Sequence, residues 1–371
     1  MNLREILGEI KKAPKPFETE VWPSFILGPT FELPYLNEVK NVEKKLSDFF
    51  KEAQKKYEKM GKEVFQKTLP SEISVKFQNF IKRVGDSVKY DFPLFVHFDG
   101  IFDGEKLWLA EIGVDPEGIS LILNMNQIYG ITQNQEFFEN LPSRVAVGVP
   151  QSQSFYFPDF REMVKKVNEN GKEWIFANDF TEKELREISK KEKGIFYRAT
   201  TSLGAVDGII GLSEIFLNWI HSPGIYLGSK IFLLSSEILK EMIPLSFLTP
   251  ITDEEIVKMK KDQRKEWIVK PTANQRSGER IFRGDQLTNK KWQEILSSQG
   301  FILQKYIPPQ EIEVEAINPQ GEMFNFKGKS KVSAFFVWNG KRYSLFGIIM
   351  TLRNSIRIHG ATDALIAPCY F

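Results

Sequence analysis

The stretch VHFDGIFDGEKLWLAEIGVDPEGISL, residues 96–121, places two carboxylates among side chains that are typical of buried strands. Its first part predicts a strand, Asp103–Gly104 a hairpin turn, and KLWLAEIG the returning strand. In such a hairpin Asp99 and Glu111 are near neighbours across the two strands. Two carboxylates in an apolar sheet repel each other and lose hydration, and a cation relieves both costs. The pair therefore predicts a Mg²⁺ site, because Mg²⁺ prefers oxygen ligands; acids at the rim of a sheet, bonded to lysines, are the alternative.

The composition is that of an ordinary globular chain. Of 371 residues, 42% are hydrophobic and 26% charged, which suffices for two or three packed lobes. The formal net charge of +2 gives no general electrostatic reason to bind nucleic acid or a membrane surface. Cys369 is the single cysteine, which excludes an internal disulfide framework and a thiolate metal cluster. The N-terminal segment lacks the apolar core of a signal peptide and no apolar run reaches membrane-spanning length, so we expect a cytoplasmic protein without a membrane or nucleic-acid partner.

Periodicity indicates an N-terminal part, residues 1–143, that combines helices with the hairpin. Apolar residues recur at three- and four-residue spacing over 36–62, which predicts a helix among lysines and glutamates. A second helix is predicted over 71–84. The hairpin follows these helices.

The remaining chain predicts two further parts. Residues 144–225 alternate strand and helix, which predicts a Rossmann-like layer with a parallel sheet. No G-x-G-x-x-G turn follows the first strand, so dinucleotide binding is not expected there. Residues 226–371 predict strands and turns, with helices at 252–264 and 288–298. The predicted fold class is therefore α/β (α+β).

Two lysines stand where phosphate groups are often bound. Lys270 ends the apolar strand WIVKP and precedes a turn that contains Ser277 and Gly278. Backbone N–H groups of such a turn and a lysine ammonium can converge on the same phosphate oxygens. Lys230 stands just ahead of an apolar segment that predicts a helix. Solvated lysines, one at a strand end and one at a helix start, are the alternative.

The segment FILQKYIPP, residues 301–309, predicts a strand that proline breaks. A broken strand leaves backbone N–H and C=O groups that can hydrogen-bond the edge of an adenine. The residues at this point are Gln304, Lys305, Tyr306 and Ile307. An edge strand that simply stops at proline is the alternative.

Together these segments resemble a circularly permuted ATP-grasp ligase, in particular the synthetase domain of glutathionylspermidine synthase. The resemblance covers about residues 90–371 and rests on stretches that follow one another in the family's order: HFDGIFDGEKLWLAEIGVDPEG, GIFYRAT, LGSKIFLLSSEILKEMIP, WIVKPTANQRSGERIFRG, FILQKYIPP, and GIIMTLRNS with APCYF. The acids precede the lysines, as in the permuted order. The implied fold is a permuted ATP-grasp core, divided between residues 1–143 and 226–371, with the Rossmann-like part as a layer before it.

The resemblance implies a role for each candidate residue. The residues implied to bind ATP are Lys230 and Lys270 on the α- and β-phosphates, Ser277 and Gly278 in the phosphate loop, and Gln304, Lys305, Tyr306 and Ile307 around the adenine. Asp99 and Glu111 would hold Mg²⁺, and Arg353 would stabilise the negative charge that develops during transfer.

Two positions in the hairpin depart from the family pattern. Gly113 stands where the family has an asparagine metal ligand, and Asp115 is close enough in sequence to replace it. His97 stands where the family has an arginine, which indicates a different contact with the acyl substrate.

The activity implied by the resemblance is that of an ATP-dependent carboxylate–amine ligase. ATP phosphorylates a carboxylate, and an amine attacks the acylphosphate to form an amide or peptide bond. The partners would be small-molecule or peptide carboxylates and amines, which the sequence does not name; we expect their contacts from residues 1–90 and 151–160. A protein of the same fold that binds ATP or ADP as a sensor or scaffold is the alternative. A nucleic-acid-binding protein is disfavoured by the charge and by the absence of a basic–aromatic groove.

Overall fold

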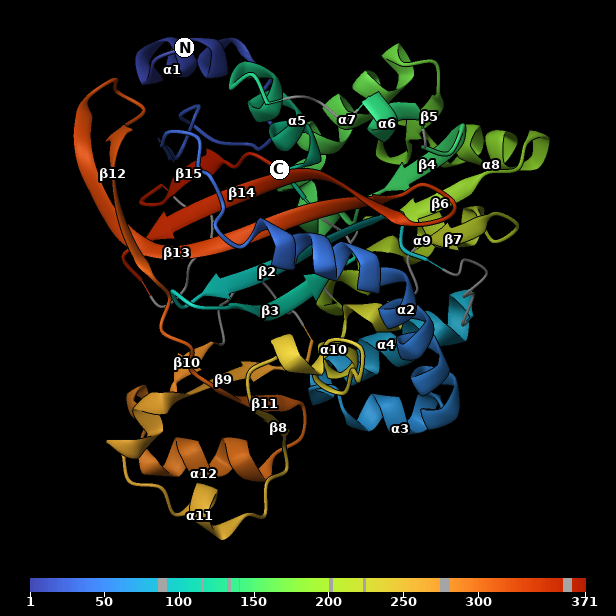
Figure 1. Cartoon of the computed structure of the whole chain (residues 1–371). Coiled ribbons are helices and arrows are strands. Elements are labelled where there is room, and N and C mark those ends of the chain that lie inside the picture. Colours follow the sequence, from blue (N-terminus) through green and yellow to red (C-terminus); the bar gives the residue numbers. More distant parts are fainter. Residues whose placement is uncertain are drawn as a thin grey trace.

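The computed structural model of the chain describes residues 1–85, 92–114, 117–131, 135–139, 141–199, 203–222, 225–273, 281–355 and 362–371. These residues form mixed α/β structure with three sheets (Figure 1). No helix within these ranges is both long enough and apolar enough to cross a bilayer.

The largest sheet has seven strands in the order β12-β1-β15-β14-β13-β2-β3. Its strands come from distant parts of the chain: β1 Ile26–Leu27, β2 Phe95–Phe102, β3 Leu107–Gly113, β12 Glu311–Ile317, β13 Met323–Trp338, β14 Tyr343–Arg353 and β15 Leu365–Pro368. Paired strands run antiparallel, except β1 and β15, which are parallel. The long strands β13 and β14 cross the middle of the molecule, with β2 and β3 beside them (Figure 1).

The predicted hairpin is present as β2 and β3. Asp99 lies directly opposite Glu111, and the register shifts at the next pair, Gly100 and Leu109. Ala110 is therefore the extra residue of a β-bulge next to the two acids. Because residues opposite each other share a face of a sheet, both carboxylates lie on the same face.

Helices cover both faces of the large sheet. On one face, inward residues such as Val332 and Ile348 pack with α2 (Leu36–Met60), α3 (Lys62–Lys67) and α4 (Ser71–Val84). On the other face, Phe335 and Ile349 pack with α1 (Leu3–Lys12), α5 (Ile119–Ile128) and α7 (Phe157–Glu169). The helices predicted over 36–62 and 71–84 are confirmed as α2 and α4.

A four-stranded parallel sheet follows the hairpin in sequence, in the order β5-β4-β6-β7. Its strands are β4 Arg144–Gly148, β5 Glu173–Phe176, β6 Ile195–Arg198 and β7 Ile220–Ser222. The helices of this region are α6 Gln135–Glu139, α7, α8 Glu182–Lys191 and α9 Ile210–Ile215. The predicted alternation of strand and helix is present here, with apolar β4 in the interior of the sheet.

A second four-stranded sheet, in the order β10-β9-β11-β8, lies below the large sheet in Figure 1. Its strands are β8 Ser246–Leu248, β9 Trp267–Pro271, β10 Phe282–Arg283 and β11 Phe301–Lys305. One face packs on α12 (Asn289–Ser297) through Trp267, Val269 and Leu303. Lys270 is opposite Ile302 and Gln304 is opposite Ile268, so Lys270 and Gln304 share the other face.

Two helices are shorter than the sequence predicts. The apolar segment after Lys230 forms a single turn, α10 (Ile231–Leu234), and residues 252–264 form α11 (Glu254–Val257) with a later 3₁₀ turn, Gln263–Glu266. Arg264 explains why the helix predicted over 252–264 is interrupted. Its Nε donates to Met259 O at 2.9 Å, and its guanidinium lies over the Trp292 ring at 5.0 Å. This tertiary contact outweighs the local helix propensity.

Gly300 connects α12 to β11 in a place where a side chain has no room. Its φ is +86°, and an added Cβ would lie 2.4 Å from Pro70 N. We expect Gly300→Ala to lower the free energy of unfolding by about 2–4 kcal/mol, because a backbone clash adds to an unfavourable left-handed conformation. Gly171→Ala is the matched control, since Gly171 has φ +80° but open space around it, and should lose about 1 kcal/mol. Urea unfolding measures both, and equal losses would contradict the steric argument.

Candidate functional site

Asp99 projects from β2 and is held by two residues of β13. Lys331 Nζ lies 2.9 Å from Asp99 Oδ2, and the Ser333 hydroxyl donates to Oδ1 at 2.6 Å. Burial opposes ionisation, but the Lys331 charge, His97 and the hydroxyl outweigh it, so the pKa of Asp99 falls to about 2. The carboxylate is therefore ionised at neutral pH.

Lys230 and Lys270 reach the hairpin from two different segments. Lys230 Nζ lies 3.0 Å from Glu111 Oε1, and Lys270 Nζ donates to Ala110 O at 2.8 Å. The two segments are also joined through their backbones, because Lys230 N donates to Thr272 O at 2.7 Å. The structure thus brings together four residues singled out in the sequence: Asp99, Glu111, Lys230 and Lys270.

Both carboxylates are paired with lysines, as the sheet-rim alternative predicts. Lys230 and Lys270, however, are not solvated, which was the alternative to phosphate binding. Lys230 is 6% exposed and Lys270 is 4% exposed. Lysine is rarely buried so far unless it is paired or functional, so the expectation of solvated lysines is wrong for both.

Lys270 has an unusual acid–base character. Burial lowers its pKa most, the charge of Lys230 lowers it further, and the attraction of Glu111 and Asp99 only partly compensates, which leaves the pKa at about 7. At neutral pH the amine is therefore partly deprotonated. A bound anion would raise the pKa, because it favours the charged form.

The segment predicted to frame adenine lies at one end of the small sheet. Gln304 is buried and donates from Nε2 to Ser246 Oγ at 2.9 Å, on the sheet face that carries Lys270. Lys305 lies on the opposite face, 5.4 Å from the Trp267 ring centre, and pairs with Glu266 at 2.5 Å. The backbone of Tyr306 is also held, because Tyr306 N donates to Glu266 O at 2.8 Å. Ile307, the next residue, is partly buried.

Arg353 belongs to β14 of the large sheet, whereas Asp99 and Glu111 belong to β2 and β3. It lies opposite Lys329 at the end of β14, on the same sheet face as Lys331 and Asp99 but further along the strands. Its guanidinium pairs with Asp363 at 2.9 Å. Asp115, Ser277 and Gly278 lie outside the described residues.

Three charged or polar groups around Asp99 and Glu111 were not predicted from the sequence. Lys331 and Ser333 could have been found from the alternation KGKSKVS, which puts every second side chain on one face of β13. Glu117 is partly buried beyond the hairpin, and burial, with the nearby charges of Asp159, Glu111 and Asp99, raises its pKa to about 8. Glu117 is therefore mostly protonated at neutral pH.

Asp159 holds the backbone that follows Glu117. It is fully buried at the start of α7 and accepts hydrogen bonds from Gly118 N at 2.8 Å and Ser120 N at 2.9 Å. These are orphan N–H groups at the N-terminus of α5, so Asp159 caps α5 from a neighbouring helix. Burial raises its pKa to about 6 in spite of these bonds.

His97 and Gly113, the two departures from the family pattern, are in direct contact. They lie opposite each other on β2 and β3, and the imidazole covers the glycine. A Cβ added at Gly113 would lie 2.1 Å from His97 Cε1. The ring also stacks on Phe335 at 5.7 Å, and burial lowers its pKa. The two departures are therefore coupled, because the imidazole fills the space of a side chain at position 113.

The cluster fits Mg²⁺ only in part. Among the described residues, no three His, Cys, Asp or Glu side chains are arranged to share a metal ion. Asp99 and Glu111 nevertheless supply hard carboxylate oxygens from directly opposed positions. This donor chemistry fits a Mg²⁺ ion that takes its other ligands from phosphate oxygens and water.

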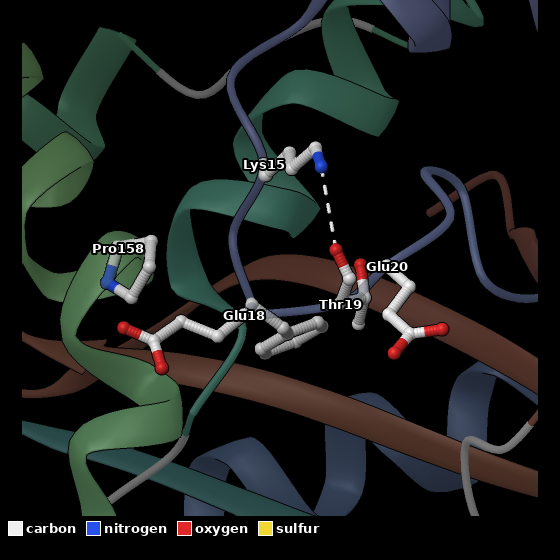
Figure 2. Close-up of a pocket in the computed structure, with 6 residues that line it drawn as sticks. Lys15, Glu18, Thr19, Glu20 and Pro158 are labelled. Carbon is white, nitrogen blue, oxygen red and sulfur yellow. Dashed lines mark hydrogen bonds between the residues drawn. The ribbon is translucent and has the colours of Figure 1, made fainter.

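A separate hollow of about 460 Å³ lies at the surface between the N-terminal loop and α7 (Figure 2). Its lining residues are Lys15, Phe17, Glu18, Thr19, Glu20 and Pro158. Phe17 stacks on Phe155 of the 3₁₀ turn Gln151–Tyr156, with ring centres 5.5 Å apart. Pro158 precedes Asp159 at the start of α7. The same helix end therefore lines the hollow and bonds the backbone of Gly118 and Ser120.

Comparisons with known proteins give one match to a family. A model described as the tubulin-tyrosine ligase family matches residues 225–309, which carry Lys230, Lys270 and Gln304. No curated protein matches the chain. Among solved structures, one from Methylobacillus flagellatus KT, which carries the provisional name gamma-glutamylcysteine synthetase, is 10% identical and has a TM-score of 0.33. The alignment covers 82% of this chain and 86% of that one, but a likeness at this TM-score carries no argument.

The contact between His97 and Gly113 makes a prediction about stability. Gly113→Ala should lower the free energy of unfolding by about 2–3 kcal/mol, because the new methyl group collides with the ring. In a His97→Ala background the same change should cost less than about 1 kcal/mol, because the ring is gone. A double-mutant cycle by chemical denaturation tests this, and additive effects of the two substitutions would show that the residues are not coupled.

Proposed function

We propose that the protein is an ATP-dependent ligase that joins a carboxylate to an amine through an acylphosphate. The observation that carries the proposal is the convergence of Lys230 and Lys270, both buried, on the hairpin of Asp99 and Glu111. Two lysines that face a pair of carboxylates suit a bound metal–triphosphate, whose anionic oxygens and cation match the two kinds of charge. The family match over 225–309 supports the same reading.

In this proposal each residue has a defined task. Lys230 and Lys270 hold the α- and β-phosphates, and the segment Gln304, Lys305, Tyr306 and Ile307 binds adenine, with Ser277 and Gly278 near the phosphates. Asp99 and Glu111, with Asp115, hold Mg²⁺, which when bound neutralises phosphate charge. A carboxylate oxygen of the acyl substrate attacks the γ-phosphorus and ADP leaves. The amine then attacks the acyl carbon, its nitrogen gives up a proton to water, phosphate leaves, and Arg353 stabilises the developing negative charge.

We further propose the permuted ATP-grasp arrangement for this chain. Acids that precede the lysines in sequence, in a sheet completed by β12–β15, support that order. The three parts would then be residues 1–143 and 226–371 as the divided core and residues 144–225 as the Rossmann-like layer. We also propose that the chain is related to glutathionylspermidine synthase and that the protein is cytoplasmic.

We propose that the acyl and amine substrates are small molecules or peptides. We expect their contacts from residues 1–90 and 151–160, and residues of both ranges line the hollow in Figure 2. Its carboxylates, Glu18 and Glu20, are suited to a cationic group of a substrate.

A second candidate function is a nucleotide-binding sensor or scaffold of the same fold. It is favoured by Gly113 at a metal-ligand position and by the ion pair that engages Glu111. Nucleotide binding without phosphate release, in the presence of amines and carboxylates, would distinguish it from the ligase.

Calorimetry with a non-hydrolysable ATP analogue tests the proposal. We expect binding that is tighter with Mg²⁺ than without it, by about tenfold or more. Mg²⁺-independent binding would favour the sensor, and the absence of binding would remove the ATP site altogether.

Glu111→Gln tests the carboxylate. The variant should lose Mg²⁺-dependent ATP turnover by on the order of 100-fold or more while the fold is retained, because the amide is a poor substitute for an anionic metal ligand. Glu313→Gln is the control, since Glu313 is an exposed glutamate in the same sheet. Turnover is followed by phosphate release and the fold by circular dichroism. Unchanged turnover would exclude Glu111 from the metal site.

The low pKa of Lys270 predicts that nucleotide binding takes up protons. Its pKa of about 7 in the free protein should rise when phosphate binds, so proton uptake should grow as the pH increases from 7 to about 9. Calorimetry in buffers of different ionisation enthalpy measures this uptake. The Lys270→Met variant provides the control, because it should lose the buffer dependence. Equal heats in all buffers for the native chain would contradict a phosphate contact by Lys270.

A further inference from the structure

Lys230 stands at the start of α10, which is a single helical turn of four residues. A turn of this length is not stable by itself, because nucleation costs more than one turn of hydrogen bonds returns. The position of the Lys230 ammonium therefore depends on contacts made by the flanking backbone. On the N-terminal side these are the Lys230 N–H to Thr272 O and the stacking of Tyr226 on Tyr57 of α2, with ring centres 4.0 Å apart.

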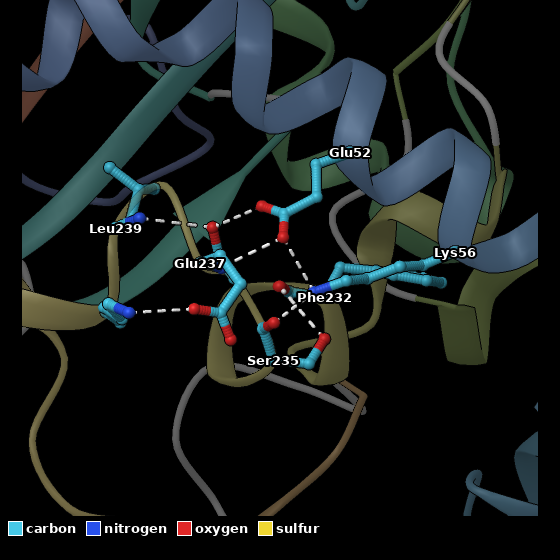
Figure 3. A network of polar contacts seen from close by, with 8 residues as sticks. Glu52, Lys56, Phe232, Ser235, Glu237 and Leu239 are labelled. Atoms are coloured by element: carbon cyan, nitrogen blue, oxygen red, sulfur yellow. Dashed lines mark hydrogen bonds and ion pairs between the residues drawn. The ribbon is translucent and has the colours of Figure 1, made fainter.

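On the C-terminal side, Glu52 and Lys56 of α2 hydrogen-bond the residues immediately after α10 (Figure 3). We call these two residues the α2 clamp. Glu52 accepts the Ser236 hydroxyl at 2.7 Å and Glu237 N at 2.9 Å. Lys56 donates to Ser235 O at the end of α10 and pairs with Glu52 at 2.8 Å. The carboxylate thus satisfies two donors and the ammonium one acceptor on three successive residues.

Charge makes this clamp stronger than ordinary side-chain contacts. Burial opposes the ionised form of Glu52, but Lys56, the Glu237 N–H and the Ser236 hydroxyl outweigh it and lower the pKa of Glu52. Hydrogen bonds to a charged acceptor are shorter and stronger than neutral ones. Lys56 at the C-terminal carbonyls of α10 also has the charge that a helix end favours.

We propose that Glu52 is a positioning residue for Lys230, and that through α10 it sets the affinity of the site for ATP. This inference rests on the proposed function, since it assumes that Lys230 binds phosphate. Glu52 itself does not touch the nucleotide in this proposal. It fixes the turn from which Lys230 projects, so that the ammonium is already placed before phosphate binds.

The same helix supplies a matched control. Glu43 of α2 accepts Leu345 N at 2.8 Å, so it bonds one backbone N–H as Glu52 does, but on β14 instead of beside Lys230. Glu43→Ala should therefore lower stability without a specific effect on nucleotide affinity. Glu52→Gln retains one acceptor oxygen and should behave between Glu52→Ala and the native chain.

The experiment measures the Kd of a non-hydrolysable ATP analogue with Mg²⁺, together with kcat and KM for ATP, in Glu52→Ala, Glu52→Gln and Glu43→Ala. We expect Glu52→Ala to raise Kd and KM by about tenfold, which corresponds to about 1.4 kcal/mol, while kcat changes much less. Glu52→Gln should recover part of this loss. Hydrogen exchange at residues 231–239 should be faster in Glu52→Ala and unchanged in Glu43→Ala.

The outcomes are distinguishable. If the native chain does not bind the analogue, the proposed function fails and the role of Lys230 falls with it. If the native chain binds and Glu52→Ala binds equally well, the positioning role is overturned while the ATP site stands. An equal loss of affinity in Glu43→Ala would also overturn it, because the effect would then follow from stability alone. A loss confined to Glu52 variants, with partial rescue by glutamine, supports the proposal.

Discussion

The candidate site depends on how two carboxylates are accommodated side by side on one face of a sheet. Asp99 and Glu111 face each other across β2 and β3, where their mutual repulsion and lost hydration would be costly without counter-charges. Lys331 and Lys230 supply these charges from β13 and from the turn before α10. Lys270 reaches the same place through a hydrogen bond to the carbonyl of Ala110, the bulged residue next to Glu111 on β3. Three distant segments are therefore joined at one pair of acids.

Helix α2 holds the surrounding backbone by a related device. Besides Glu43 and Glu52, Glu38 accepts Leu107 N at 2.9 Å, at the first residue of β3. Each glutamate satisfies a backbone N–H of a different element, so one helix fixes β3, β14 and the turn that follows Lys230. These carboxylates hold the three points in place, because hydrogen bonds to a charged acceptor are stronger than neutral ones.

The sequence was informative where the local pattern and the tertiary structure agree. The hairpin, α2, α4 and the parallel strands follow from periodicity, because each buries one face or both. The helix predicted over 252–264 was wrong in extent, and the helix expected after Lys230 is a single turn, because Arg264 and the α2 clamp bind backbone that a longer helix would use itself. The alternation KGKSKVS places Lys331 and Ser333 on one face of a strand, but their pairing with Asp99 could not be predicted, because Lys331 and Asp99 are 232 positions apart in sequence. The contact of His97 with Gly113 depends on register, which one residue of slip would change.

The large sheet also has a consequence for the order in which the protein is made. Strand β2 can pair with β13 only after the ribosome has released more than two hundred further residues, since Asp99 waits for Lys331 and Ser333. Until then Asp99 lacks the ammonium of Lys331 and the hydroxyl of Ser333. Folding of this region is therefore late in synthesis and dominated by long loop closure. A nascent chain that ends before β13 therefore cannot carry the assembled site.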